Sequence, residues 1–188
     1  AEVLLHGDIH QENADKIGVS RKLVKTISYA FLYGAGDQKL GLSYDKQLSP
    51  DKAKKKGKEI RKAYIDAIPG LEKLLEGVHK ASEKGFVRGI DKRKILVDSK
   101  HKSLNYLIQG SSAVLAKKWM LLTHENLPPT AKQLAFVHDE LQFECKKKDV
   151  EDLKFLLELS AVQAGEYYNL RCPIAAESKS GSTWADVH

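Results

Sequence analysis

The chain has 188 residues, of which 42% are hydrophobic, so it can build one large domain or two small lobes around a core. Its formal net charge of +6 and its sequence pI near 9.1 favour acidic partners, with nucleic acid first among them. Cys145 and Cys172 have neither a metal-ligand spacing nor a disulfide framework, which indicates a reduced, cytosolic setting, and neither a signal peptide nor an apolar run long enough to span a membrane is visible.

Two helices are predicted at the start of the chain. Residues 9–17 form a short helix, and residues 20–33 form a longer one. Ser20 is a good N-cap for the second helix, and Gly34 followed by Gly36 marks its end.

A lysine-rich helix is predicted next. The sequence Ser49-Pro50-Asp51 supplies a cap, a proline at the first helical position and an early acid, and the helix runs to about residue 67. Its cationic side chains are Lys52, Lys54, Lys55, Lys56, Lys58, Arg61 and Lys62. Such a run is usually a solvated face, and the alternative is a sequence-neutral contact to a phosphate backbone.

The remaining elements give an α+β class. In chain order they are a helix at 71–84, a hairpin at 86–97, a helix at 103–124, strands at 132–138 and 141–145, a helix at 150–165 and a short strand near 173–178. Almost nothing joins the two longer strands, which implies a tight hairpin with His138, Asp139 and Glu140 at its bend. Helix dominates, and a small antiparallel sheet lies in the second half.

The helix at 20–33 carries an unusual row of side chains. Arg21, Lys25, Tyr29 and Tyr33 follow one another at four-residue steps and therefore share one face. Cations near a helix N-terminus oppose the helix dipole by roughly 0.3–1 kcal/mol each, so stability alone does not favour them there. That end, with its free N–H groups, suits a polyanion such as a triphosphate, and a basic surface helix is the alternative.

An ordered series of motifs runs through the chain. It comprises Gly7-Asp8-Ile9-His10, the pattern Arg-x3-Lys-x3-Tyr-x3-Tyr-Gly from Arg21 to Gly34, Gly89-Ile90-Asp91-Lys92-Arg93-Lys94, His101-x3-Asn105-x3-Gln109, Val137-His138-Asp139-Glu140 and Trp184-x3-His188. In order and approximate spacing the series resembles the family A DNA polymerases, and above all their podophage replicative branch. Each motif alone is weak, whereas the ordered set is specific. The resemblance implies part of the right-hand polymerase fold, with a mostly helical fingers subdomain at residues 1–85 and the C-terminal part of the palm subdomain, with its antiparallel sheet, at residues 86–188.

The resemblance also implies a nucleotide site on the helix at 20–33. The activity would be template-directed addition of deoxynucleotides to a primer by two-metal phosphoryl transfer. Lys25 would bind the incoming triphosphate and act as general acid for pyrophosphate. Arg21 and His10 would contact the same phosphates.

The two tyrosines of this helix would contact the nucleotide and the template strand, respectively. Tyr29 would stack near the sugar and base, and a tyrosine here resembles the version that accepts dideoxynucleotides readily. Tyr33 would contact the template strand. One position departs from the family, because Ala30 stands where glycine is usual and adds a methyl group where the templating base approaches closely.

Asp139 is the best candidate for a metal ligand. Magnesium favours carboxylate oxygens, and a tight hairpin bend can project one out of a sheet. By resemblance Asp139 binds both Mg²⁺ ions of a two-ion site, Glu140 assists nearby and His138 approaches the primer end. Taken alone, His-Asp-Glu is most often a polar turn.

Amide side chains one helical turn apart are typical of minor-groove contacts. Asn105 and Gln109 share a face, and amides can donate to and accept from groove positions that are nearly independent of sequence. By resemblance Gln109 probes the base pair at the active site, whereas Asn105, His101 and Arg93 touch the template–primer duplex. The terminal His188 resembles the histidine that points back towards the primer-side site.

One required motif is absent from the sequence. The family's second catalytic aspartate lies in an Asp-x-Ser-x-x-Glu-like pattern upstream of the fingers, and the thumb and proofreading exonuclease also have no counterpart here. We therefore expect the chain to be a C-terminal piece that works in the cytoplasm of a bacterium or phage-infected bacterium, with primer–template DNA, deoxynucleoside triphosphates and an N-terminal polymerase segment as partners.

Two other functions remain as alternatives. A non-catalytic basic module would bind nucleic acid through its lysine-rich helices and would respond mainly to salt. A metal-dependent hydrolase using His138, Asp139 and Glu140 would leave the helix at 20–33 unexplained.

Overall fold

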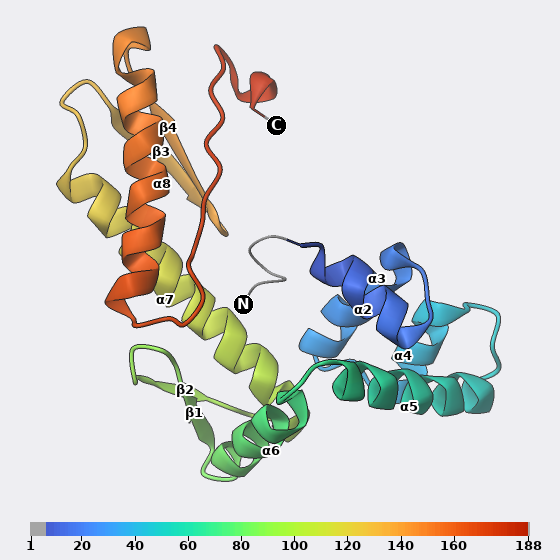
Figure 1. Cartoon of the computed structure of the whole chain (residues 1–188). Helices are drawn as coiled ribbons and strands as arrows, with labels where there is room; N and C mark the ends of the chain where they lie inside the picture. Colours follow the sequence, from blue (N-terminus) through green and yellow to red (C-terminus); the bar gives the residue numbers. More distant parts are fainter. Residues whose placement is uncertain (1–6, 188) are drawn as a thin grey trace. The chain divides into compact units, whose positions relative to one another are not determined.

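The computed structural model describes residues 7–187, which form two compact units that divide between Ile108 and Gln109. The first unit holds α2 (Ile9–Ile17), α3 (Arg21–Leu32), α4 (Asp37–Tyr44), α5 (Pro50–Ala67), α6 (Leu71–Ser82), β1 (Phe86–Arg88), β2 (Lys94–Leu96), η1 (Lys100–Lys102) and the first turns of α7 (Ser103–Glu125). The second unit holds the rest of α7, β3 (Lys132–Val137), β4 (Glu140–Glu144), η2 (Lys147–Asp149), α8 (Val150–Tyr167) and η3 (Trp184–Asp186) (Figure 1). Helices dominate and the strands pair in two antiparallel hairpins, which confirms the α+β class.

The helix predicted at residues 20–33 is α3, with the expected ends. The Ser20 hydroxyl accepts a hydrogen bond from the backbone N–H of Leu23 at 3.3 Å. At the other end Gly34 adopts φ +70°, a left-handed conformation that glycine accepts at little cost, and its N–H donates to the Phe31 carbonyl at 3.0 Å. The sequence thus specifies both the start and the stop of α3.

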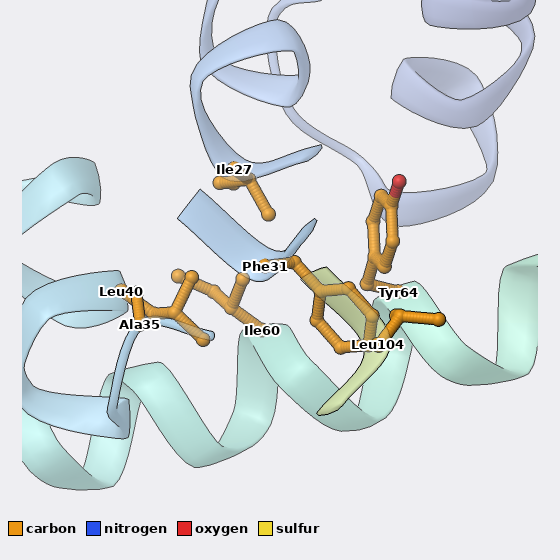
Figure 2. Packing of buried hydrophobic residues seen from close by; sticks show 7 residues of the cluster. All are labelled: Ile27, Phe31, Ala35, Leu40, Ile60, Tyr64 and Leu104. Carbon is orange, nitrogen blue, oxygen red and sulfur yellow. The ribbon is translucent and has the colours of Figure 1, made fainter. Parts of the chain in front are cut away.

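The core of the first unit gathers side chains from four helices and from the loop between α3 and α4. Its buried cluster consists of Ile27, Phe31, Ala35, Leu40, Ile60, Tyr64 and Leu104 (Figure 2). The rings of Phe31 and Tyr64 pack with their centroids 4.9 Å apart. Leu104 belongs to α7, so the first turn of that long helix is anchored in the same core as α3.

Helix α4 was not predicted, and its packing explains why. Its N-cap, Gly36, offers no side chain to cap the helix, so local sequence signals are weak. Two glycines instead let α4 and α5 approach closely. A Cβ on Gly57 would lie 1.7 Å from the carbonyl oxygen of Asp37, and one on Gly41 would lie 1.9 Å from that of Ala53. Tertiary contact with α5 therefore stabilises α4.

The hairpin of the second unit confirms the predicted pair of longer strands. Strands β3 and β4 run antiparallel from the pair Lys132–Glu144 to the pair Val137–Glu140. Glu140 is thus the first residue of β4, and the bend itself contains only two residues, His138 and Asp139.

The predicted strand near residues 173–178 is wrong, because this segment has no strand partner among the described residues. It runs back beside α8 in an extended path (Figure 1). The backbone N–H of Ser178 donates to the Glu158 carboxylate at 3.1 Å, and its hydroxyl lies 3.4 Å from the Lys154 carbonyl oxygen. Hydrogen bonds to a side chain and a carbonyl group of α8 thus replace the strand-to-strand hydrogen bonds of a sheet.

Both cysteines, Cys145 and Cys172, are free thiols. Across residues 7–187, no helix combines the length and the apolar character needed to cross a membrane.

Candidate nucleotide and nucleic-acid site

The α3 side chains predicted to contact the nucleotide and the template strand share one exposed face. Arg21 and Lys25 are exposed, and Tyr29 and Tyr33 have exposed fractions of 52% and 61%. The opposite face is buried in the core described above. The four-residue spacing therefore places two cations and two aromatic rings on one side of a single rigid helix.

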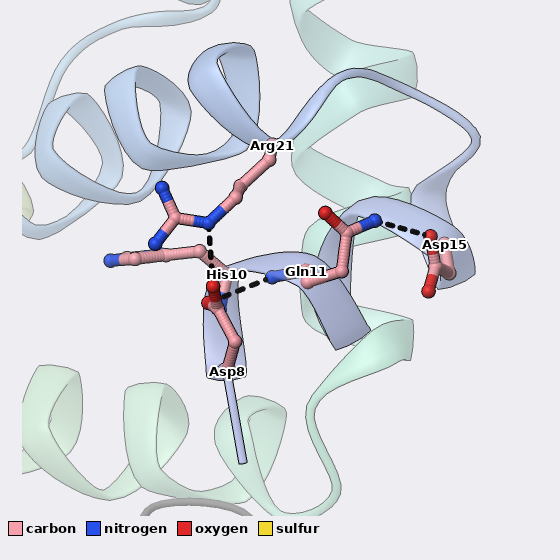
Figure 3. A network of polar contacts seen from close by, with 5 residues as sticks. All are labelled: Asp8, His10, Gln11, Asp15 and Arg21. Atoms are coloured by element: carbon pink, nitrogen blue, oxygen red, sulfur yellow. Dashed lines mark hydrogen bonds and ion pairs between the residues drawn. The ribbon is translucent and has the colours of Figure 1, made fainter.

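Asp8 joins this face to the start of α2. As the N-cap of α2, it accepts hydrogen bonds at one carboxylate oxygen from the backbone N–H groups of His10, at 3.0 Å, and Gln11, at 3.1 Å. Its other oxygen accepts from Nε of Arg21 at 2.6 Å (Figure 3). One carboxylate thus holds α2 and the first residue of α3 together.

This contact sets the electrostatics of the α3 N-terminus. The Arg21 guanidinium, followed by the Gln11 N–H group, holds the pKa of Asp8 below its ordinary value. The carboxylate in turn offsets the unfavourable position of a cation at a helix start. Only Nε of Arg21 is used, and its two Nη groups have no partner among residues 7–187, so they remain able to donate to an anion.

His10 lies in the first turn of α2, beside this ion pair. In Figure 3 its imidazole and the Arg21 guanidinium extend in the same direction. Its Nδ1 atom is buried and has no hydrogen-bond partner in the described part of the chain. The structure thus brings two of the three predicted phosphate contacts together through Asp8, whose bridging role sequence reasoning missed. The signal for it was an aspartate at an N-cap position.

The end of α3 approaches the segment that carries His101. A Cβ on Gly34 would lie 2.6 Å from the His101 carbonyl oxygen, so only glycine permits this contact. Tyr33, next to Gly34, and His101 are both exposed, and the His101 Nδ1 atom lies 2.8 Å from the Ser99 hydroxyl. Two residues predicted to touch DNA are therefore neighbours within the first unit.

The other predicted duplex contacts lie on the β1–β2 hairpin and on α7. Arg93 forms an ion pair with Asp91, two residues before it in the hairpin turn. Asn105 is half-buried in the first turn of α7, and Gln109 is exposed at the start of the second unit. His188 lies outside the described residues.

In the second unit, the β3–β4 turn presents the predicted metal ligand. Asp139 and His138 are both exposed at the two-residue bend. His138 has φ +55°, the left-handed conformation that a two-residue hairpin turn requires at its first position. Glu140 follows as a half-buried residue that accepts a hydrogen bond from the amide of Gln142.

The fit of this turn to a metal ion is partial. Within residues 7–187, no three or more His, Cys, Asp or Glu side chains gather as a metal-binding group. Magnesium is commonly held by one or two carboxylates together with water and phosphate oxygens, so the exposed Asp139 suits the role of a single ligand.

A cavity of about 500 Å³ lies elsewhere, between α6, β1 and the first turns of α7. Its lining includes Leu74, Val78 and Phe86 and none of the predicted site residues. The candidate nucleotide face of α3 is therefore distinct from this cavity.

Known proteins resemble this chain along its whole length. The sequence profile described as DNA polymerase family A matches residues 4–186. The DNA-directed DNA polymerases of Enterobacteria phage T3 and Escherichia phage Phieco32 are 29% and 33% identical to this chain, over alignments of 214 and 198 positions. Both alignments cover the whole chain and 30% and 31% of the respective relatives, so the chain spans less than a third of their length.

A solved structure shares the fold. It is the POL domain of Pol1 from M. smegmatis, in complex with DNA primer-template and dNTP. It matches 90% of this chain and 33% of its own, with a TM-score of 0.74 and 24% sequence identity. Since the profile matches the chain almost from end to end, the chain belongs to DNA polymerase family A.

Proposed function

We propose that this chain is the C-terminal portion of a template-directed DNA polymerase that adds deoxynucleotides to a primer by phosphoryl transfer. The observation that carries the proposal is the exposed face of α3, on which Arg21, Lys25 and Tyr29 follow one another at one-turn intervals. Membership of the family supports it, as does the similarity to the DNA-directed DNA polymerases of the two phages.

The cations of α3 would serve the triphosphate. Phosphoryl transfer asks a protein mainly to position the phosphates and to stabilise charge, and lysine and arginine do both. Lys25 would hold the triphosphate and supply a proton to the departing pyrophosphate. The Nη groups of Arg21 and the imidazole of His10 would bind the same phosphates, with Asp8 fixing the Arg21 side chain.

The remaining site residues would contact nucleotide and DNA. Tyr29 would stack on the sugar and base, and Tyr33 would meet the template strand. The duplex contacts would be Arg93, His101, Asn105, Gln109, His138 and His188. The complex with primer-template and dNTP in the M. smegmatis structure supports these partners.

Asp139 would hold Mg²⁺, with Glu140 beside it. When bound, the metal lowers the pKa of the attacking hydroxyl and neutralises the phosphates. A second carboxylate would come from an N-terminal polymerase segment, which would also carry the thumb and the exonuclease, because these 188 residues lack the second aspartate motif. Residues 1–85 would be fingers and 86–188 palm, in the cytoplasm of a bacterium or phage-infected cell.

Nucleotide binding tests the proposal. Titration with a fluorescent deoxynucleoside triphosphate should give at least about tenfold weaker binding for Lys25→Ala, because a hydrogen bond to a charged group contributes about 1.5–3 kcal/mol. Lys22→Ala removes an exposed cation from the same helix outside the Arg21–Lys25 row and should change affinity little. Equal effects of the two variants would contradict the proposal.

Primer extension tests the need for the missing segment. We expect no extension by the chain alone with Mg²⁺, and Asp139→Ala should abolish extension by the complete polymerase. Extension by the chain alone would show that no second segment is required.

A further inference from the structure

Helix α5 carries more cationic side chains than take part in contacts within the fold. Its 18 residues include six lysines and one arginine against three acids. Arg61 serves the fold, because it donates to the Asp37 carboxylate and to the Ala35 carbonyl, each at 2.6 Å. Lys56 lies 4.7 Å from the centre of the Tyr44 ring and 3.5 Å from a Glu59 carboxylate oxygen.

The other five lysines of α5 take no part in such contacts within the fold. They are exposed and have no hydrogen-bond or ion-pair partner among residues 7–187; this lysine face consists of Lys52, Lys54, Lys55, Lys58 and Lys62. The buried stripe of the same helix runs through Ala53, Gly57, Ile60 and Tyr64 and packs on the body of the unit. Figure 1 shows α2 and α4 on the same side of α5. The lysine face therefore points away from the core that supports α3.

Stability does not favour this arrangement. Lys54, Lys58 and Lys62 are spaced by four residues, and like charges at that spacing repel one another along a helix. Asp51 and Asp66, three and four residues away, can attract only the outer lysines Lys54 and Lys62. The central Lys58 has only cations three and four residues away, which are Lys54, Lys55, Arg61 and Lys62. A row of charges kept despite repulsion indicates a polyanionic partner.

The face is also rigid and free of apolar anchors. The close contacts at Gly41 and Gly57 hold α5 against α4, so the lysines project from a helix whose position is fixed by packing. No large hydrophobic side chain of α5 is exposed, whereas protein interfaces gain most of their affinity from buried aromatic and aliphatic anchors. The charge pattern therefore fits a nucleic-acid backbone better than an acidic protein.

We propose that the lysine face of α5 binds the sugar-phosphate backbone of DNA without reading its sequence, as a contact separate from the nucleotide face of α3. The inference rests on the proposed polymerase function, which brings DNA to this unit. From Lys54 to Lys62 the helix rises about 12 Å, enough to follow roughly four phosphates of one strand at about 3.4 Å each. Single-stranded and duplex DNA share this chemistry.

A matched pair of triple variants tests the proposal. Lys54→Gln/Lys58→Gln/Lys62→Gln removes the central row. Lys146→Gln/Lys147→Gln/Lys148→Gln removes three lysines in and next to η2 that are also exposed. Fluorescence anisotropy would measure binding of the chain to a labelled thymidylate strand and to a blunt duplex, between about 50 and 200 mM salt.

The α5 variant should bind at least about tenfold more weakly at the lowest salt. The slope of log binding constant against log salt concentration should become shallower by about two to three. Each lost phosphate contact reduces this slope by about 0.7 on single strands and about 0.9 on duplex. The DNA form that shows the larger change is the one bound by the face. The control variant should keep the slope of the parent chain.

Several results would overturn the inference. One is an unchanged salt dependence of DNA binding in the α5 variant, and another is an equal loss of DNA affinity in both variants. A third is that polyglutamate displaces DNA as effectively as unlabelled thymidylate at the same concentration of charge. Glutamine keeps helix propensity and removes repulsion, so circular dichroism should show unchanged helicity and a melting temperature no lower than the parent's. Nucleotide binding separates this inference from the proposed function, because the α5 variant should keep the triphosphate affinity that Lys25→Ala loses.

Discussion

At the scale of single residues, Asp8 has the most consequential contacts of the candidate site. Its carboxylate caps α2 and receives the Arg21 side chain, so it couples the position of one predicted phosphate ligand to the helix that carries another. A residue that would not touch substrate thereby fixes the geometry of two that would.

The pH dependence of stability tests this role. Because the pKa of Asp8 is lower in the folded chain than its ordinary value, its contribution to stability is present at neutral pH and is lost as pH falls through the folded pKa. Asp8→Asn keeps a good N-cap but removes the charge, so it should lower the melting temperature at neutral pH, and the difference should close below about pH 4.

Asp45→Asn is the matched control. Asp45 also accepts a backbone N–H, from Gln47 at 2.8 Å, but has no ion-pair partner among the described residues. Thermal denaturation at several pH values should show a smaller effect for this variant. A pH-independent loss in Asp8→Asn would show that Arg21 gains nothing from the charge.

At the scale of elements, the α4–α5 pair shows packing overriding local propensity. Gly57 lies inside α5, where alanine would be the better helix former by about 1 kcal/mol. Yet a Cβ there would lie 1.7 Å from the Asp37 carbonyl oxygen. The same glycine that weakens α5 as an isolated helix lets α4 dock on it.

Gly57→Ala should therefore destabilise the first unit by about 1–3 kcal/mol or more, because backbone atoms must move apart. Gly77→Ala in α6 is the control, since nothing lies within 4 Å of its added methyl group and it should stabilise by up to about 1 kcal/mol. Urea denaturation followed by circular dichroism would compare them. If Gly57→Ala left the free energy of unfolding unchanged, the α4–α5 contact would be loose.

At the scale of the whole molecule, the two units have separate packing. The buried cluster around Phe31 belongs to the first unit alone, and in the second unit the Trp119 indole donates to the Leu157 carbonyl at 2.8 Å, tying α7 to α8. Helix α7 is the element that belongs to both units.

Leu40→Ala should weaken the first unit selectively. Leu40 is fully buried, and truncating such a side chain costs about 2–5 kcal/mol. Hydrogen–deuterium exchange should show faster exchange across α2 to α5 and unchanged protection in α8. Equal acceleration in both units would show that the chain unfolds as one cooperative body.

Local signals account for most of the elements. The Ser20 cap, the glycine after α3, the Ser49-Pro50-Asp51 start and the two-residue bend at His138 all act within a few residues, so the sequence predicts them well. The helical spacing of Arg21, Lys25, Tyr29 and Tyr33 likewise determines that these side chains share one face, because every helix has the same period.

Local sequence signals could not predict contacts between residues that lie far apart in the chain. Helix α4 forms because Gly41 and Gly57 admit a close neighbour, and the segment at 173–178 is not a strand because α8 satisfies it. The partnership of Asp8 with Arg21 joins residues 13 positions apart. By itself the sequence determined the other helices, their charged faces and the family. Only the tertiary structure decided that α4 forms and which polar groups meet, because both depend on how separate elements pack and not on any local period.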